Sequence, residues 1–389
     1  MTPHGPGHNI VIVGGSIAAL TSAQVLRAEG FGGDITMLSA EAYPPYSRVP
    51  LSKAVLLGAA EHETCTLPVA GDDFEIRLEQ RAIGLDSRNR LVRLSTGEEV
   101  RYDGLVVASG ARARRLSRPG QQGEHVVRDL DDVRALGACL HNARSVVVIG
   151  AGFLGMEVAS SCRKLGLAVT VIDRDPPLQR LLGTWLGGIV AQRAKDAGVR
   201  FLRAVEGVTL LGEDVVKGVR CGGQIIEADV VVSAIGDIPN VEWLSGSSLH
   251  SEGPLVVDQR CIASEGVVAA GDVAAIRDGT GVVNRLPHWN NAVRQARVAA
   301  LSLLYGDDAP VAEPDHYFWT EAFDLQIKVC GLIPRDDTPE ILEHNEGADS
   351  FVLQWTSRTG SPVAAATVNR KMPVVKLRRL AEESAAVAS

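Results

Sequence analysis

Two short glycine-rich stretches of this chain have the composition of turns that cradle phosphate groups. Residues 14–19 read Gly-Gly-Ser-Ile-Ala-Ala and residues 150–155 read Gly-Ala-Gly-Phe-Leu-Gly, each directly after an apolar run. Each pattern predicts a buried strand, a tight turn and a helix whose first N–H groups can bind a pyrophosphate. Two such turns predict two dinucleotides, and the expected pair is a tightly held FAD and a diffusible nicotinamide coenzyme.

The second turn has glycine at all three positions of the dinucleotide fingerprint, Gly150, Gly152 and Gly155. The first makes the turn, the second lets the backbone approach the pyrophosphate, and the third packs the helix on the strand. Asp173 ends the next strand, where a carboxylate binds the ribose hydroxyls of NAD and repels a 2′-phosphate. We therefore expect NADH, with NADPH left open because Arg174 is adjacent. The alternative is a turn that only packs helix on strand.

The first turn is less regular, because Ser16 takes the second glycine position after Gly14. Serine is small enough to approach a phosphate, and its hydroxyl can donate a hydrogen bond. Glu41 lies just after the next predicted strand and can reach an adenosine ribose, although an ordinary solvated loop acid is the alternative. Asp272 follows Gly271 at the end of a later apolar strand, where it can accept from a ribityl hydroxyl, cap a helix, or do both.

The elements that must position these residues alternate between strands and helices. Around the first turn we predict a helix over 18–29 that ends at Gly30, a strand over 34–38, and a polar, proline-rich loop over 41–60. Strands are also predicted within 74–108, 145–173, 199–235, 266–272, 351–355 and 363–368, and helices over 289–304 and near 373–383. The pattern changes after Pro310, which predicts a separate α+β domain.

The repeated strand–turn–helix–strand unit predicts an α/β fold in which the second dinucleotide domain is inserted into the first. The expected boundaries are 1–115 and 239–314 for the FAD-binding domain, 116–238 for the NAD-binding domain, and 315–389 for the C-terminal domain.

Composition limits the classes of function. The 389 residues carry a net charge of −8 at pH 7, which argues against a nucleic-acid-binding protein. No apolar run reaches the roughly 18 residues of a membrane span, and residues 1–9 lack the apolar core of a signal peptide, so we expect a cytoplasmic protein. The six cysteines form no CxxC or CxxxxC pair and no zinc spacing, so we expect no metal and no redox disulfide. Electrons on a flavin must then pass straight to an acceptor.

Several longer motifs carry a resemblance to a known family. They are Pro-Tyr-Ser-Arg-Val-Pro-Leu-Ser-Lys at 45–53, Ala-Ser-Gly-Ala-Arg at 108–112, Gly-Asp-Ile-Pro-Asn at 236–240, Ala-Ala-Gly-Asp-Val-Ala at 269–274, His-Trp-Asn-Asn-Ala-Val-Arg-Gln-Ala at 288–296 and Tyr-Phe-Trp-Thr at 317–320. The chain resembles, over nearly its whole length, the FAD-dependent NAD(P)H:ferredoxin reductases of bacterial oxygenase systems, the group of putidaredoxin reductase, biphenyl dioxygenase reductase and the rubredoxin reductases. The resemblance implies a glutathione-reductase-like fold of two Rossmann-like domains with a C-terminal α+β interface domain.

The resemblance also implies roles for individual residues. Arg48 and Lys53 would face the flavin, with the lysine near N5 stabilising the anionic reduced form, and Glu157 would lie beside the nicotinamide. Asp272 and the backbone near Val293 would hold the ribityl chain and ring, and Trp289 and Trp319 would flank the flavin. Further residues expected at the FAD site are Ala18, Ala19, Ala40, Ala82, Ser109, Gly110 and Arg112, and at the NAD site Phe153, Leu154 and Gly236. The departures from the family pattern are Ser16, Ser47, Val49, Pro287 and Ala296.

The function that this resemblance implies is electron transfer from NADH through FAD to a small acidic iron–sulfur ferredoxin, by a monomer or weak homodimer. Arg294 and Arg297 are three apart on the helix expected from 289, so they share a face that can attract such a partner. The alternative is that both pair with acids of this chain, and the basic cluster over 370–379 is then the next candidate. Two rival functions remain: a biosynthetic flavin oxidoreductase acting on a small molecule, and a signalling flavoprotein of the apoptosis-inducing type.

Overall fold

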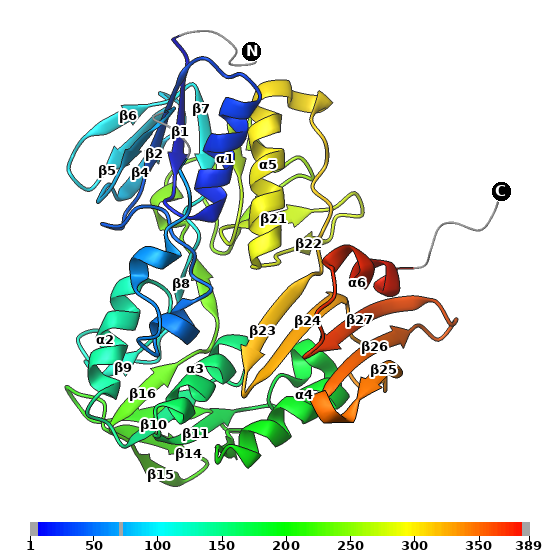
Figure 1. The fold of residues 1–389 in the computed structure, drawn as a ribbon. Helices are drawn as coiled ribbons and strands as arrows, with labels where there is room; N and C mark the ends of the chain where they lie inside the picture. Colours follow the sequence, from blue (N-terminus) through cyan, green and yellow to red (C-terminus); the bar gives the residue numbers. More distant parts are fainter. Residues whose placement is uncertain (1–6, 70–72, 383–389) are drawn as a thin grey trace, which may run out of the picture. The chain divides into compact units, whose positions relative to one another are not determined.

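The computed structural model describes residues 7–69 and 73–382, and the chain divides into two compact units, each made of three segments (Figure 1). The first unit comprises residues 1–47, 63–112 and 237–315, and the second comprises residues 48–62, 113–236 and 316–389. Residues 1–6, which carry most of the expectation about a signal peptide, lie outside the described residues.

The first unit is built on a six-stranded sheet of order β19-β20-β7-β1-β2-β3. Its strands are β1 (Asn9–Val13), β2 (Asp34–Leu38), β3 (Glu75–Arg77), β7 (Gly104–Val107), β19 (Ile262–Ser264) and β20 (Val267–Ala269). All neighbours run parallel except β19 and β20. The central strands are continuous apolar runs because both faces of such a sheet are covered. Smaller sheets are formed by β4 (Ala82–Asp86), β5 (Leu91–Leu94) and β6 (Glu99–Arg101), and by β18 (Leu255–Val257), β21 (Ala274–Arg277) and β22 (Val283–Asn284).

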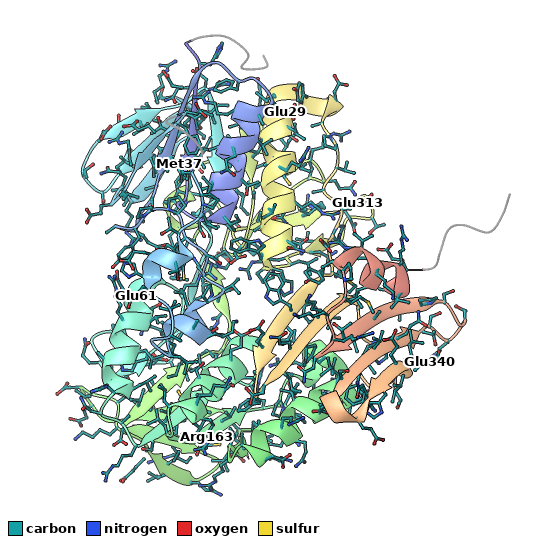
Figure 2. The ribbon with its side chains drawn as sticks, in the orientation of Figure 1. Glu29, Met37, Glu61, Arg163, Glu313 and Glu340 are labelled. Carbon is teal, nitrogen blue, oxygen red and sulfur yellow. The ribbon has the colours of Figure 1, made fainter. Side chains whose placement is uncertain are left out.

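Two helices, α1 (Ile17–Ala28) and α5 (Trp289–Tyr305), pack side by side against this sheet (Figure 1). Their contact is close because small residues face it, and the Ser22 hydroxyl donates to the Ala296 carbonyl at 3.3 Å. Helix α1 ends at Ala28 with Glu29 as its C-cap, and Gly30, with a φ of +82°, takes the predicted C′ position. In Figure 2 the side chain of Met37 lies within this unit, and it is fully buried.

The second unit contains a parallel sheet of order β12-β11-β10-β16-β9. Its strands are β9 (Glu124–His125), β10 (Ser145–Ile149), β11 (Ala168–Asp173), β12 (Arg200–Arg203) and β16 (Val230–Ser233), and its helices are α2 (Leu130–Leu140), α3 (Phe153–Lys164) and α4 (Gln179–Asp196). A small antiparallel sheet joins β13 (Val208–Leu211), β14 (Gly218–Cys221) and β15 (Gln224–Glu227). The predicted strand–turn–helix–strand unit over 145–173 is confirmed by β10, α3 and β11.

The C-terminal segment of this unit is the predicted α+β element. Its antiparallel sheet has the order β23-β24-β27-β26-β25, with β23 (Phe318–Ala322), β24 (Leu325–Gly331), β25 (Glu340–Asn345), β26 (Ser350–Thr356) and β27 (Pro362–Val368). Helix α6 (Val374–Ala381) packs on it through Leu377, which is fully buried. The edge strand β25 is exposed throughout, as its labelled Glu340 shows in Figure 2.

One local prediction was wrong. The stretch over 41–60 is not only a loop, because residues Leu51–Val55 form a π-helical turn, η1, that buries Leu51 and Ser52. Leu51 and Leu56 supply the apolar part of its buried face, a pattern too short to distinguish from a loop. The turn matters because it carries Lys53.

Candidate dinucleotide and redox site

The first glycine turn is closed by the neighbouring strand. Gly14 follows β1 with a φ of +148°, and a Cβ there would clash with the carbonyl oxygen of Ala108, which follows β7. β2 lies on one side of β1 and β7 on the other, so the turn sits where the strand order reverses. In open α/β sheets, ligands bind at this point, at the carboxyl ends of the strands.

The residues expected around this turn come together in the first unit. Ser16 is the N-cap of α1, yet its side chain makes no capping hydrogen bond. Gly271 has a φ of +82°, and a Cβ there would lie 3.1 Å from that of Ala18. Its N–H donates to the Gln295 side chain at 2.9 Å, so α5 fixes the turn before Asp272. Gln295 was not among the predicted residues, although it lies in the motif that begins at His288.

Glu41 is held by protein contacts. The Tyr46 hydroxyl donates to its carboxylate, and its carbonyl accepts from the N–H of Glu79 at 3.1 Å. The N–H of Gln80 donates to the Ser39 carbonyl at 2.7 Å, so the segment leading to Ala82 runs beside that of Ala40 and Glu41. These contacts hold Glu41 more firmly than a freely solvated loop acid would be held.

The segment that follows β7 contains Ser109, Gly110 and Arg112, which bond to residues 240 and 242. The Ser109 hydroxyl donates to the Asn240 carbonyl at 2.8 Å, and the Asn240 amide donates back to the Ser109 carbonyl at 2.9 Å. Gly110 accepts from the Asn240 N–H and has a φ of +67°. The Arg112 guanidinium pairs with Glu242. These residues therefore have structural partners in addition to their expected place beside FAD.

Arg285 is a residue that the sequence did not suggest. Its Nε donates to the Asp272 carbonyl and its Nη1 to the Asp237 carboxylate, both at 2.7 Å. Its Nη2 is buried and has no partner among the described residues. The guanidinium thus fixes the backbone of Asp272. Only its position two residues before Pro287 connects it with a sequence motif.

The second glycine turn repeats the first in the second unit. Gly150 has a φ of +109°, and a Cβ there would clash with the carbonyl oxygen of Ala234, which follows β16. A Cβ at Gly155 would clash with the Gly150 carbonyl, which confirms the packing role of the third glycine. Gly152 is the N-cap of α3, and a Cβ there would meet no described atom within 4 Å. Phe153 and Leu154 follow in the first turn of α3, and Gly236, with a φ of +94°, ends the loop after Ala234.

Asp173 lies at the end of β11, facing this turn. Its Oδ2 accepts from the Ala151 N–H at 2.6 Å, so the carboxylate reaches the glycine loop. The arginine that lies near its carboxylate is Arg180, whose Nη2 is 3.7 Å from Asp173, and both Arg180 and the adjacent Arg174 are exposed. Arg180 also pairs with Asp175 at 3.2 Å. Arg180 is the second residue of α4, and the turn of the chain between β11 and α4 brings it back to Asp173.

Glu157 and Lys53 form a direct ion pair in the second unit, with Nζ 2.7 Å from Oε2. The same Oε2 accepts from the Ser52 hydroxyl at 2.6 Å, and Oε1 accepts from the Thr320 hydroxyl at 2.8 Å. Glu157 is 8% exposed, so its charge is buried and paired. The sequence had suggested Lys53 and Glu157 separately, and the structure brings them together. Ser52 and Thr320 were not predicted as site residues.

The remaining expected residues divide between the units. Trp289 and Val293 lie half-buried at the start of α5 in the first unit, whereas Arg48, Lys53 and Trp319 belong to the second. Arg48 donates to the Arg128 carbonyl at 2.6 Å.

The two arginines expected at the docking surface differ in their surroundings. Arg294 lies 3.6 Å from the Asp315 carboxylate, so the alternative of an internal partner applies to it. Arg297 is exposed.

All six cysteines carry free thiols, and five are buried. Burial raises the pKa of the Cys162 thiol to about 12, which keeps it protonated at neutral pH. Such a thiol is a poor nucleophile and fits a structural role.

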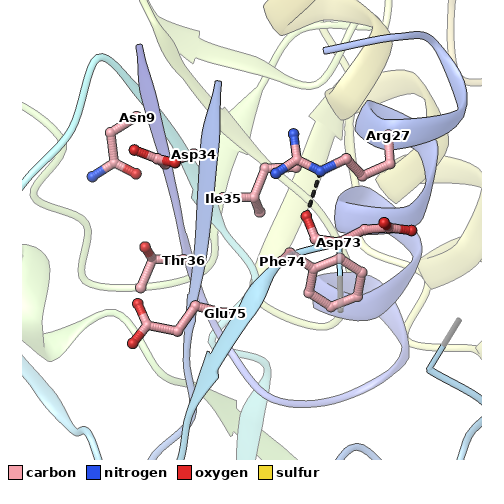
Figure 3. Close-up of a pocket in the computed structure, with 8 residues that line it drawn as sticks. All are labelled: Asn9, Arg27, Asp34, Ile35, Thr36, Asp73, Phe74 and Glu75. Atoms are coloured by element: carbon pink, nitrogen blue, oxygen red, sulfur yellow. Dashed lines mark hydrogen bonds between the residues drawn. The ribbon is translucent and has the colours of Figure 1, made fainter. Parts of the chain in front are cut away.

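One hollow of the first unit lies away from the candidate site. A polar hollow of about 460 Å³ in the first unit is lined by Asn9, Arg27 and the starts of β2 and β3 (Figure 3). It lies at the amino ends of the strands, opposite the edge that carries Gly14, so it is not the dinucleotide site.

Over the described ranges, no helix is long and apolar enough to cross a membrane.

Known proteins share this architecture. Residues 8–296 match the family described as pyridine nucleotide-disulphide oxidoreductase, and residues 317–389 match the one described as reductase C-terminal. Rhodocoxin reductase of Rhodococcus erythropolis is 35% identical, covering 85% of this chain and 79% of the relative. The ferredoxin–NAD(+) reductase component of the biphenyl dioxygenase system of Paraburkholderia xenovorans is 32% identical, covering 91% and 85%. The crystal structure of the ferredoxin reductase for the CYP199A2 system of Rhodopseudomonas palustris has a TM-score of 0.85 and 30% identity, covering 94% and 92%.

Proposed function

Since this chain belongs to the pyridine nucleotide-disulphide oxidoreductase family, we propose that it is an NADH-dependent ferredoxin reductase that holds FAD. One observation carries the proposal: two separate units each contain a glycine turn closed on the carbonyl after a neighbouring strand, at Gly14 and at Gly150. Two dinucleotide sites in one oxidoreductase indicate transfer between the two ligands.

The first unit fits FAD. Gly14 and Gly271 allow the backbone to pack closely against Ala108 and Ala18, and Ser16 presents an uncapped helix N-terminus with a hydroxyl donor. Asp272, with its backbone fixed by Arg285, would hold the ribityl chain. When bound, FAD accepts a hydride and releases electrons singly. We assign this role to residues 1–115 and 239–314, and NAD binding to residues 116–238.

The second unit favours NADH over NADPH. The Asp173 carboxylate faces the glycine loop, where a 2′-phosphate would meet a negative charge. Arg180 lies beside it but also pairs with Asp175, so the positive charge of this arginine is partly offset. Gly152 leaves the pyrophosphate position open.

The electron acceptor is proposed to be a small acidic iron–sulfur ferredoxin. Of the two relatives described above, one is named rhodocoxin reductase and the other the ferredoxin–NAD(+) reductase component of a dioxygenase system. The free, mostly buried thiols agree with transfer that needs no disulfide relay, and they agree with a cytoplasmic location. Residues 315–389 would supply the interface domain, and the exposed Arg297 would attract the partner.

A ferredoxin-dependent assay tests the proposal. The FAD-loaded protein is mixed with NADH, with and without a bacterial [2Fe–2S] ferredoxin, and NADH oxidation is followed. Fast oxidation only with the ferredoxin supports the proposal. Consumption of an added organic substrate without ferredoxin would support a biosynthetic oxidoreductase. A long-lived reduced complex with negligible turnover would support a signalling flavoprotein.

A further inference from the structure

The Glu157 carboxylate is held from two different parts of the second unit. On Oε2 it accepts from Lys53 at 2.7 Å and from Ser52 at 2.6 Å, both on the π-helical turn η1. On Oε1 it accepts from the Thr320 hydroxyl at 2.8 Å, with the Glu321 N–H at 3.5 Å. A buried carboxylate needs such donors on both oxygens, because an unpaired oxygen away from water costs free energy.

Strand β23 is fixed along α3, so Thr320 is not a chance neighbour. The Phe323 N–H donates to the Ser160 hydroxyl at 2.8 Å, and the rings of Phe318 and Phe153 lie with centroids 5.0 Å apart. These contacts flank Thr320 on both sides in sequence. Thr320 is itself only 3% exposed, so its hydroxyl has little access to water as an alternative partner.

We propose that Thr320 is a positioning residue for hydride transfer: its hydroxyl fixes the Glu157 carboxylate and, through it, the Lys53 ammonium. The Lys53 ammonium lies at the end of a flexible side chain, so its position is set by the acceptor to which it donates. Without the Thr320 hydrogen bond, Oε1 keeps only the long contact with the Glu321 N–H at 3.5 Å, and the carboxylate turns toward another donor. The C-terminal sheet therefore contributes directly to the ion pair beside the start of α3. The inference rests on the proposed function, in which NADH binds at the turn before α3.

Thr320→Val tests this role, because valine has the shape of threonine without the hydroxyl. FAD-loaded protein is mixed with saturating NADH without oxygen, and flavin bleaching is timed. We expect bleaching about tenfold slower than in the wild type, as for loss of a hydrogen bond to a charged group. FAD content should be unchanged, the dissociation constant of NAD⁺ should change by less than about threefold, and Thr320→Ser should restore the rate.

Thr367→Val is the matched control. Thr367 lies on β27 of the same sheet and is 1% exposed, and its hydroxyl has no partner among the described residues. The same substitution there should leave the bleaching rate at the wild-type value.

A double-mutant cycle separates positioning from a structural effect. In a Glu157→Ala background, adding Thr320→Val should change the bleaching rate by less than about twofold, since the hydroxyl acts through the missing carboxylate. A full tenfold loss in that background would overturn the role, as would wild-type bleaching in Thr320→Val itself. Failure of NADH to bleach the wild-type flavin would instead contradict the proposed function and the inference together.

Discussion

The two glycine turns have the same backbone solution but different side chains. In both, the first glycine follows the central strand with a positive φ, and a side chain would clash with a carbonyl oxygen after the neighbouring strand. At the third position Gly155 touches the Gly150 carbonyl, whereas the first turn holds Ala19, fully buried. Helix α1 must therefore begin far enough from its turn to accept a methyl group.

At the second position of the two turns, the packing of the chain does not require glycine. A side chain at Gly152 would meet nothing within 4 Å among the described residues, and Ser16 occupies the same position in the first turn. Packing therefore requires the first glycine and leaves the second position free to suit the proposed ligand. A fingerprint with two substitutions, Ser16 and Ala19, can therefore still form a complete turn.

The largest effects are expected at the first glycines. Gly14→Ala should give protein purified with little or no FAD, and Gly150→Ala should keep its FAD but lose at least about tenfold in NADH kcat/KM, because each methyl group clashes with backbone. FAD content and steady-state kinetics measure both.

Gly166→Ala is the control for the Gly150 change, since Gly166 also has positive φ, +84°, but open space around its Cβ. FAD loss in Gly150→Ala with normal FAD in Gly14→Ala would reverse the assignment of the two turns.

Asp173→Ala should come next. Removing the carboxylate should lower NADH kcat/KM by about tenfold and leave NADPH kcat/KM nearly unchanged or improved, because the 2′-phosphate no longer meets a negative charge. Arg180→Ala is the companion variant and should raise the preference for NADH. A wild-type protein that already uses NADPH better would show that Arg180 or Arg174 dominates this pocket.

Exchange of the second positions should have a smaller effect. Gly152→Ser should weaken NADH about threefold, because the side chain narrows the approach of the pyrophosphate without disturbing the chain. Ser16→Gly should weaken FAD by a similar factor, through loss of one hydroxyl donor. FAD release under mild denaturant and the NADH KM report the two changes. A folded Gly152→Ser protein with tighter NADH binding would contradict the role given to this position.

The smallest effect is expected at the surface. Arg297→Glu should raise the ferredoxin KM about threefold and flatten its dependence on salt, with ferricyanide reduction unchanged. Arg297 is the cleaner probe, because Arg294 already lies near Asp315. Arg88→Glu, an exposed arginine on the hairpin between β4 and β5, is the control. Equal KM values in the two variants would move the docking surface elsewhere, with the cluster over 370–379 as the next candidate.

Local patterns predicted the elements that carry the site. The apolar runs before Gly14 and Gly150, and Gly30 after the first helix, were sufficient for β1, β10 and the end of α1, because each depends on neighbours in sequence. The family resemblance added Lys53 and Glu157. Contacts between distant segments could not be found in the same way.

Thr320 is 163 residues from Glu157, and Gln295 is 24 residues from Gly271. Nothing in their local sequence indicates these partners, since the packing of β23 on α3 and of α5 on the sheet creates them. Arg180 is a similar case over a shorter stretch of sequence. The sequence had suggested Arg174 as the arginine beside Asp173, but the start of α4 turns back and brings Arg180 there.

The central claim, that electrons pass from NADH through FAD to an iron–sulfur protein, is tested most directly by an oxygen-free titration of the FAD-loaded protein. The account predicts that NADH bleaches the flavin and that an oxidised [2Fe–2S] ferredoxin, added next, restores its absorbance while the ferredoxin becomes reduced. A flavin that NADH leaves oxidised, or a reduced flavin that the ferredoxin leaves bleached, would contradict it.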